Sequence, residues 1–133
     1  MNQVAQAVKN ERLEALTAAV VEALEEKKAQ DILVVDVRGR CDFADRFVLA
    51  SGRSDRQLKA LSQSLAVVAH QYDLPARIEG LDALEWLLVD LGDIVVHLFL
   101  PDIRDSFQLE RLWGQAKKTD ALTDSSGDVS DNP

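Results

Sequence analysis

Two apolar runs separated by a short polar turn are the feature that most restricts how this chain can fold. The runs cover residues 86–89 and 94–100, and Asp90-Leu91-Gly92-Asp93 stands between them. Glycine supplies the positive φ angle that a tight reversal needs, so the two runs should pair as an antiparallel hairpin. This hairpin is the clearest local structure that the sequence predicts.

Three other segments are typical of strands. Residues 32–37 and 47–50 are nearly continuous runs of branched apolar side chains, which is the pattern of strands buried on both faces. Residues 77–79 form a shorter candidate strand. Together with the hairpin, these segments predict a sheet of about five strands.

Helical periodicity appears in three places. Apolar residues recur every three or four positions over residues 11–28, which predicts a first helix. Ser54 and Gln57 have the spacing of a reciprocal cap at the start of a second helix, and Pro75 ends that helix. A short closing helix is expected over residues 107–113. The buried stripe of the second helix should consist of Leu58, Leu61, Leu65, Val68 and Tyr72.

The order of these elements predicts an α/β domain, with a mixed sheet and helices packed on it. A chain of 133 residues has room for one such domain, which we place at residues 11–113. We expect residues 1–10 to be a flexible N-terminus. Residues 114–133 contain few apolar side chains and should form a disordered acidic tail.

Charge is unevenly distributed along the chain. The net charge is −8, from 15 basic and 23 acidic residues, which disfavours bulk binding to nucleic acid. Residues 38–59 are nevertheless locally basic, and residues 73–110 are strongly acidic. This asymmetry favours a basic partner on the later strands, while the usual role of such charges is only to keep a surface solvated.

Cysteine usage and hydropathy bear on the compartment. Cys41 is the single cysteine, which excludes an internal disulfide and any multi-thiolate metal site. No apolar run is long enough for a membrane span, and the N-terminus lacks the apolar core of an export signal. We therefore expect a cytoplasmic protein with no membrane contact.

No constellation of residues points to catalysis, a metal or a cofactor. Cys41, His70 and His97 have no partner at ligand spacing, and His97 is better explained as a satisfied, partly buried side chain than as a general base. The segment 51–54 could receive an anion where a strand meets a helix, but a plain turn and cap explain it better. No two carboxylates lie two positions apart on a strand, as a shared divalent ion would require.

Trp86 stands out because aromatic residues make up only 5% of the chain and because it opens the hairpin within an acidic stretch. Core packing is the commoner role of a tryptophan, and anchoring a partner is the alternative.

Several short blocks in a fixed order resemble the Iojap-related ribosome silencing factors, the RsfS family. The similarity runs from about Leu13 to Trp113, and the tail beyond Trp113 is not part of it. The blocks are residues 31–37, 45–57 with Ser54, Arg56 and Gln57, Glu79-Gly80, 86–97, and 107–113. The chain departs from the common pattern of the family at Ala44, Arg46, Leu91 and Phe107.

The resemblance implies a factor that is not an enzyme and needs no cofactor. It implies binding to the large ribosomal subunit, through ribosomal protein fourteen, which prevents the small subunit from joining and so lowers translation. It also implies a fold similar to the nucleotidyltransferases but without their catalytic acids.

On this hypothesis the hairpin and the strands near it dock on a basic ribosomal protein, with Trp86 as the anchor. The expected partner-binding residues are Trp86, Glu79, Asp82, Asp90, Leu91, Gly92 and Arg56. A minor contact of the basic segment with ribosomal RNA and a homodimer are both compatible with it. The alternatives are a nucleotidyl or phosphoryl transferase that uses the loop after Ala50, and a self-assembling scaffold.

Overall fold

The computed structural model describes residues 2–103 of the chain. Its element order and mixed sheet confirm the predicted α/β fold with about five strands. The predicted helix over residues 107–113 and the tail over residues 114–133 lie outside the described residues. The elements are α1 (Asn2–Glu26), β1 (Gln30–Asp36), β2 (Arg46–Ser51), α2 (Asp55–Gln71), β3 (Arg77–Glu79), β4 (Trp86–Asp90) and β5 (Ile94–Phe99).

The five strands form one sheet in the order β1-β2-β5-β4-β3. Strands β4 and β5 pair in antiparallel fashion, as the hairpin pattern predicts. Gly92 has a φ of +96° in the turn between them, where the Leu91 N–H donates to the carbonyl of Ile94. Strand β2 pairs with β5 in parallel and with β1 in antiparallel fashion, which makes the sheet mixed.

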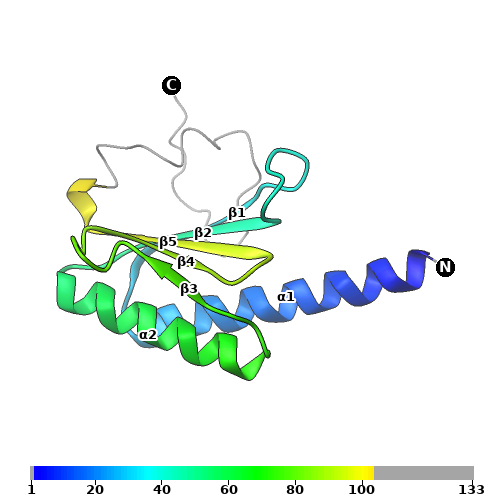
Figure 1. Cartoon of the computed structure of the whole chain (residues 1–133), viewed down its shortest axis with the longest axis horizontal. Coiled ribbons are helices and arrows are strands. Elements are labelled where there is room, and N and C mark those ends of the chain that lie inside the picture. Colours follow the sequence, from blue (N-terminus) through cyan, green and yellow to red (C-terminus); the bar gives the residue numbers. More distant parts are fainter. Residues whose placement is uncertain (1, 104–133) are drawn as a thin grey trace.

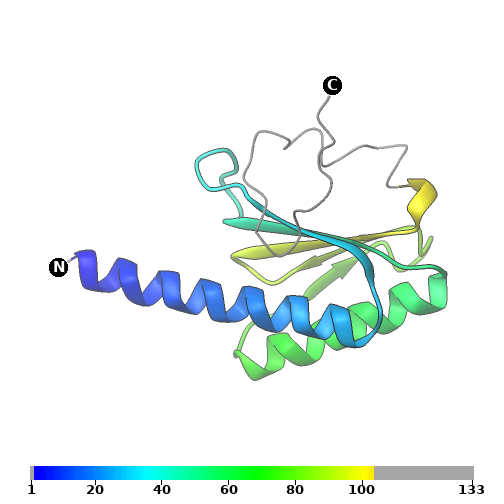
Figure 2. The same ribbon diagram turned by 180° about the vertical axis from the view of Figure 1, so that it is seen from behind.

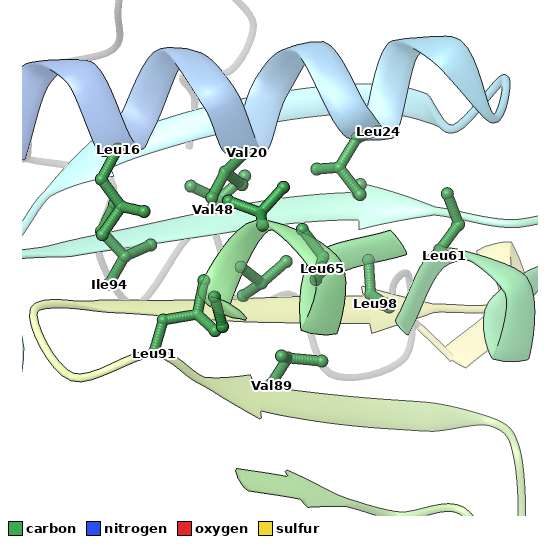
Figure 3. Close-up of a cluster of buried hydrophobic side chains, with 14 of the residues drawn as sticks. Leu16, Val20, Leu24, Val48, Leu61, Leu65, Val89, Leu91, Ile94 and Leu98 are labelled. Carbon is green, nitrogen blue, oxygen red and sulfur yellow. The ribbon is translucent and has the colours of Figure 1, made fainter. Parts of the chain in front are cut away.

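Both long helices cover the same face of the sheet (Figures 1 and 2). Strand side chains alternate between the two faces, so every second strand residue meets α1 or α2. The core that results is entirely aliphatic at its centre (Figure 3), where Leu65 of α2 lies in one cluster with side chains of the sheet and of α1. We call this side of the sheet the helix face. Its labelled residues are Leu16, Val20, Leu24, Val48, Leu61, Leu65, Val89, Leu91, Ile94 and Leu98.

Helix α2 begins as the sequence predicts. The Ser54 hydroxyl accepts a hydrogen bond from the backbone N–H of Gln57 at 3.1 Å. The Gln57 carboxamide oxygen accepts from the backbone N–H of Arg53, one residue before the cap, at 2.6 Å. The carboxamide nitrogen of Gln57 donates to the carbonyls of Lys27 and Lys28, which also ties the start of α2 to the end of α1.

Helix α1 begins much earlier than expected. Residues 2–10, for which we expected a flexible N-terminus, are helical, and this part of α1 projects past the sheet (Figures 1 and 2). Residues 2–26 contain no glycine or proline that would interrupt the helix. Val4 and Val8 are exposed, which explains why amphipathic periodicity did not reveal this extension.

A buried arginine joins α1 to the sheet. Arg46 lies on β2, and its guanidinium pairs with the carboxylate of Glu14 and donates to the hydroxyl of Thr17 at 3.0 Å. The hydrogen bond from Arg46 lowers the pKa of Glu14 below its ordinary value. A charge at a buried strand position is thus satisfied by two groups of the first helix, which fixes the helix against β2.

Candidate functional site

The second face of the sheet carries a different set of side chains from the helix face. We call it the aromatic face. The register places Glu79, Leu88, His97 and Leu49 side by side across β3, β4, β5 and β2. Its buried apolar residues are Leu33, Val35, Val37, Ala44, Phe47, Leu49, Val95 and Phe99, with Cys41, Trp86, Leu88 and Ile103 partly buried beside them.

Four rings form the centre of the aromatic face. Trp86 stacks on Phe99 with ring centroids 5.5 Å apart, and the imidazole of His97 lies 4.9 Å from the ring of Phe47. His97 is also 6.1 Å from Phe99 and nearly parallel to it. Such offset and tilted pairs are favourable arrangements of aromatic rings, so the four side chains support one another.

His97 is a neutral hydrogen-bond acceptor in this cluster. The indole Nε1–H of Trp86 donates to His97 Nδ1 at 3.3 Å. Burial lowers the pKa of His97 from 6.5 to about 4, because the charged imidazolium would lose its hydration. A neutral imidazole whose Nδ1 accepts must carry its proton on Nε2, and this buried nitrogen has no hydrogen-bond partner within residues 2–103.

The segment that leads from β3 to β4 carries three carboxylates and ends at Trp86, the first residue of β4. Residues 79–85, which we call the acidic segment, contain Glu79, Asp82 and Glu85, with no basic residue. All three are exposed, and Leu81 between them is 43% exposed. An exposed apolar side chain among carboxylates, beside a half-buried indole, suits a partner that is both basic and apolar.

Gly80 shapes the acidic segment. Its φ is +98°, and a Cβ at this position would stand 2.2 Å from the carbonyl oxygen of Trp86. The Gly80 carbonyl accepts from the Leu84 N–H at 3.0 Å, and the Glu85 carbonyl accepts from the Leu100 N–H at 3.0 Å. Only glycine allows the backbone to pass this close to the start of β4.

The structure brings together some of the residues that the sequence pointed to. Glu79 and Asp82 lie at the end of β3 and in the acidic segment, at the same end of the sheet as Trp86. Asp90 and Gly92 lie at the other end of β4, roughly 13 Å away at the rise of a strand. One carboxylate oxygen of Asp90 accepts from the Gly92 N–H at 2.9 Å, so this aspartate shapes the turn.

One of the expected partner-binding residues needs correction, and a second lies on another layer of the fold from Trp86. Leu91 has 0% of its surface exposed and packs in the core of the helix face, so its side chain is unavailable to a partner. Its apolar side chain follows the turn inward, against the aliphatic core. Arg56 is exposed, but it belongs to the first turn of α2, in the helix layer, and Trp86 belongs to the opposite face.

Sequence reasoning missed most of the aromatic face. Phe47 and Phe99 were assigned only to buried strands, and His97 was interpreted as a satisfied histidine although one of its nitrogens has no partner among the described residues. Phe43 lies in the loop between β1 and β2, is 70% exposed, and has its ring 6.0 Å from that of Phe47. The alternation of residues along β2 and β5 was the signal that could have separated this face from the other.

Polar groups elsewhere are largely used within the fold. Arg38 pairs with Asp36, and this hydrogen bond lowers the pKa of Asp36 and raises the pKa of Arg38. Arg46 of the same basic segment is buried against Glu14. The segment 51–54 caps α2, as described above. Within residues 2–103, no three His, Cys, Asp or Glu side chains gather where they could hold a metal ion. No described helix is long and apolar enough to cross a membrane.

The chain matches one family model over residues 10–132, and that family is described as "Ribosomal silencing factor during starvation". The match extends past Trp113, where we expected the shared pattern to end. It therefore includes most of residues 114–133.

Curated and solved proteins agree with this match. The chain is 40% identical over 108 residues to the ribosomal silencing factor of Zymomonas mobilis, covering 80% of this chain and 81% of that protein. It is 39% identical over 98 residues to a mouse protein named for mitochondrial assembly of the ribosomal large subunit, covering 71% of this chain and 43% of that protein. The crystal structure of a Chromobacterium violaceum protein superposes with a TM-score of 0.73 at 37% identity, covering 83% of this chain and 92% of that one.

Proposed function

The chain belongs to the family of ribosomal silencing factors, and from this we propose that it binds the large ribosomal subunit through ribosomal protein fourteen. Bound there, it keeps the small subunit from joining and so represses translation. We place this action in the cytoplasm.

The observation that carries the proposal is the position of Trp86 beside the acidic segment. A half-buried indole is the kind of side chain that anchors interfaces, because it buries a large area and offers one hydrogen bond donor. The exposed carboxylates of Glu79, Asp82 and Glu85 give this end of the sheet a negative potential. Ribosomal proteins that hold RNA are basic, so the charges of the two partners are complementary.

The proposed mechanism is occlusion and needs no reacting group. An obstacle on the face where the subunits meet has to reside there long enough to prevent joining. An interface of about 1,600 Å² in total is ordinary for a stable complex of two proteins. The relatives named as silencing factors fit a regulatory role of this kind.

The direct test replaces the anchor. Trp86→Ala should weaken binding to purified large subunits by about 2 kcal/mol, close to thirtyfold, measured by co-sedimentation at increasing protein concentration. Val67→Ala is the matched control, because Val67 is an exposed apolar side chain on α2, 57% exposed. Thermal unfolding of both variants shows whether they are folded. A folded Trp86→Ala protein that binds as tightly as the wild type would exclude this docking site.

Further measurements distinguish a protein partner from ribosomal RNA, and occlusion from other mechanisms. Binding to isolated ribosomal protein fourteen, as tight as binding to the subunit, supports a protein interface; weaker binding to the isolated protein assigns part of the interface to ribosomal RNA. Purified subunits that still join in the presence of excess protein would refute occlusion. Calorimetric binding of a nucleotide with magnesium would favour a transferase, and self-association without subunit binding would favour a scaffold.

A further inference from the structure

The sheet register makes Trp86 and His97 diagonal neighbours on the aromatic face. Trp86 lies opposite Phe99, and His97 lies opposite Leu88, so the indole and the imidazole come from adjacent strands and are offset by two residues. Their ring centroids are 6.2 Å apart, and the indole N–H donates to Nδ1 of His97. Diagonal pairs at this offset are within reach of one another when the side chains are aromatic.

His97 itself is held firmly in place. It is 8% exposed and contacts the rings of Phe47 and Phe99. A phenylalanine at position 97 could make the same ring contacts. It would also avoid a buried Nε2–H that has no partner in the part of the chain that the structure describes.

The imidazole of His97 provides something that a phenylalanine ring could not, a hydrogen-bond acceptor for the indole of Trp86. Indole can only donate a hydrogen bond, and among His97, Phe47 and Phe99 only the imidazole offers an acceptor. Trp86 is half-buried, so packing restrains its ring less than it restrains the fully buried rings. A bond to a rigid, buried acceptor therefore restrains the orientation of the indole, in addition to its stacking on Phe99.

We propose that His97 is a positioning residue, which holds the indole of Trp86 in the orientation that the ribosomal partner binds. The proposal rests on the proposed function, because it takes Trp86 to be the anchor. It assigns His97 no contact with the partner. The pre-ordered indole loses less rotational freedom on binding, which strengthens the complex.

The experiment compares three residues at position 97 in a protein with one tryptophan. Trp113→Phe leaves Trp86 as the single indole, since the chain has two tryptophans. In this background His97→Phe keeps the ring and removes the acceptor, whereas His97→Asn keeps an acceptor near the place of Nδ1. The indole N–H is followed by its nitrogen-15 resonance and its rate of hydrogen exchange, and binding is measured on purified large subunits.

We expect His97→Phe to shift the indole resonance upfield, to speed its exchange, and to weaken binding by about tenfold, the equivalent of one hydrogen bond. His97→Asn should restore both readouts in part. When Trp86→Phe is added to Trp113→Phe, no indole donor remains, and His97→Phe should then cause no further loss of binding. An unchanged indole resonance in folded His97→Phe, or an equal loss of binding in both backgrounds, would overturn the proposal.

Failure of the proposal and failure of the proposed function give different results. If the wild-type protein does not bind large subunits, the function is wrong, and the indole resonance still reports whether His97 holds Trp86. If the wild type binds and His97→Phe changes the resonance without changing affinity, the docking site stands and the positioning role is refuted. Should His97→Phe not fold, His97→Leu takes its place in the same comparisons, because it also lacks an acceptor.

Discussion

The two faces of the sheet differ in chemistry although they are built from the same five strands. The helix face is aliphatic and sealed by α1 and α2, with Val48, Val96 and Leu98 completely buried. The aromatic face carries the rings of Phe47, Trp86 and Phe99, together with His97. Aliphatic side chains contribute burial alone, whereas these rings add directional contacts and hydrogen bonds. On the proposed function, the helix face chiefly provides stability and the aromatic face provides recognition.

Shortening one leucine on each face tests whether the two faces have these different roles. Leu65→Ala removes a fully buried side chain from the helix face and should lower the free energy of unfolding by about 4 kcal/mol. Leu88→Ala removes a half-buried side chain from the aromatic face and should cost less than half of that. Chemical denaturation measures both. The folded fraction of the Leu65→Ala protein should bind large subunits normally, whereas the Leu88→Ala protein should bind them more weakly. The reverse pattern would contradict the division of roles between the two faces.

The second prediction uses acid to probe the aromatic face alone. The folded pKa of His97 is about 4 and its ordinary value is 6.5, so the unfolded chain takes up a proton first as the pH falls. Stability contributed by the neutral histidine is complete above pH 6.5 and is lost as the pH falls toward 4. The loss should be on the order of 3 kcal/mol.

The control for this prediction is His97→Phe, which has nothing to titrate at that position. The pKa values of Glu14 and Asp36 are also lowered. The stability that these carboxylates contribute is lost only as the pH falls below their ordinary pKa values of 4.5 and 3.8. Between pH 6.5 and 4.5, the free energy of unfolding should therefore change less with pH for His97→Phe than for the wild type. Equal slopes for the two proteins would show that His97 is not buried in its neutral form.

Two glycines offer a matched test of the segment that presents Trp86. Gly80 and Gly92 both have positive φ, but a Cβ at Gly92 would meet nothing within 4 Å, whereas one at Gly80 would strike the Trp86 carbonyl. Gly80→Ala should cost about 2 kcal/mol more than Gly92→Ala in thermal unfolding. It should also weaken subunit binding. If Gly92→Ala were the more damaging change, the β4–β5 turn would matter more than the acidic segment.

The smallest expected effect concerns charge. Glu79→Gln together with Asp82→Asn removes two carboxylates of the acidic segment, and Glu25→Gln together with Glu26→Gln removes two from the end of α1. The first pair should slow association with large subunits and reduce its dependence on salt, with less than about 1 kcal/mol lost in affinity. The second pair has the same net charge and should do neither. Identical salt dependence for the two variants would mean that only net charge matters.

Much of the fold could be predicted from the sequence because its signals are local. The turn at Gly92, the cap at Ser54 and Gln57, and the apolar periodicity of α2 each depend on residues a few positions apart. Trp86 and the acidic residues near it were also found from the sequence. Arg46 was identified only as a departure from the family pattern, because its partner Glu14 lies 32 positions away.

Local patterns in the chain were enough to predict the strands, the second helix, the turns between them and the apolar alternate positions, but not the start of α1. Three features depend on contacts between distant segments: both helices cover one face, β2 pairs with β5 in parallel, and Leu91 lies in the core while Trp86 bonds to His97. Apolar periodicity predicts that a side chain is buried, but it does not identify the side chains that it contacts. That choice depends on the packing of segments distant in the chain, where volume, ring geometry and hydrogen bonding are settled together.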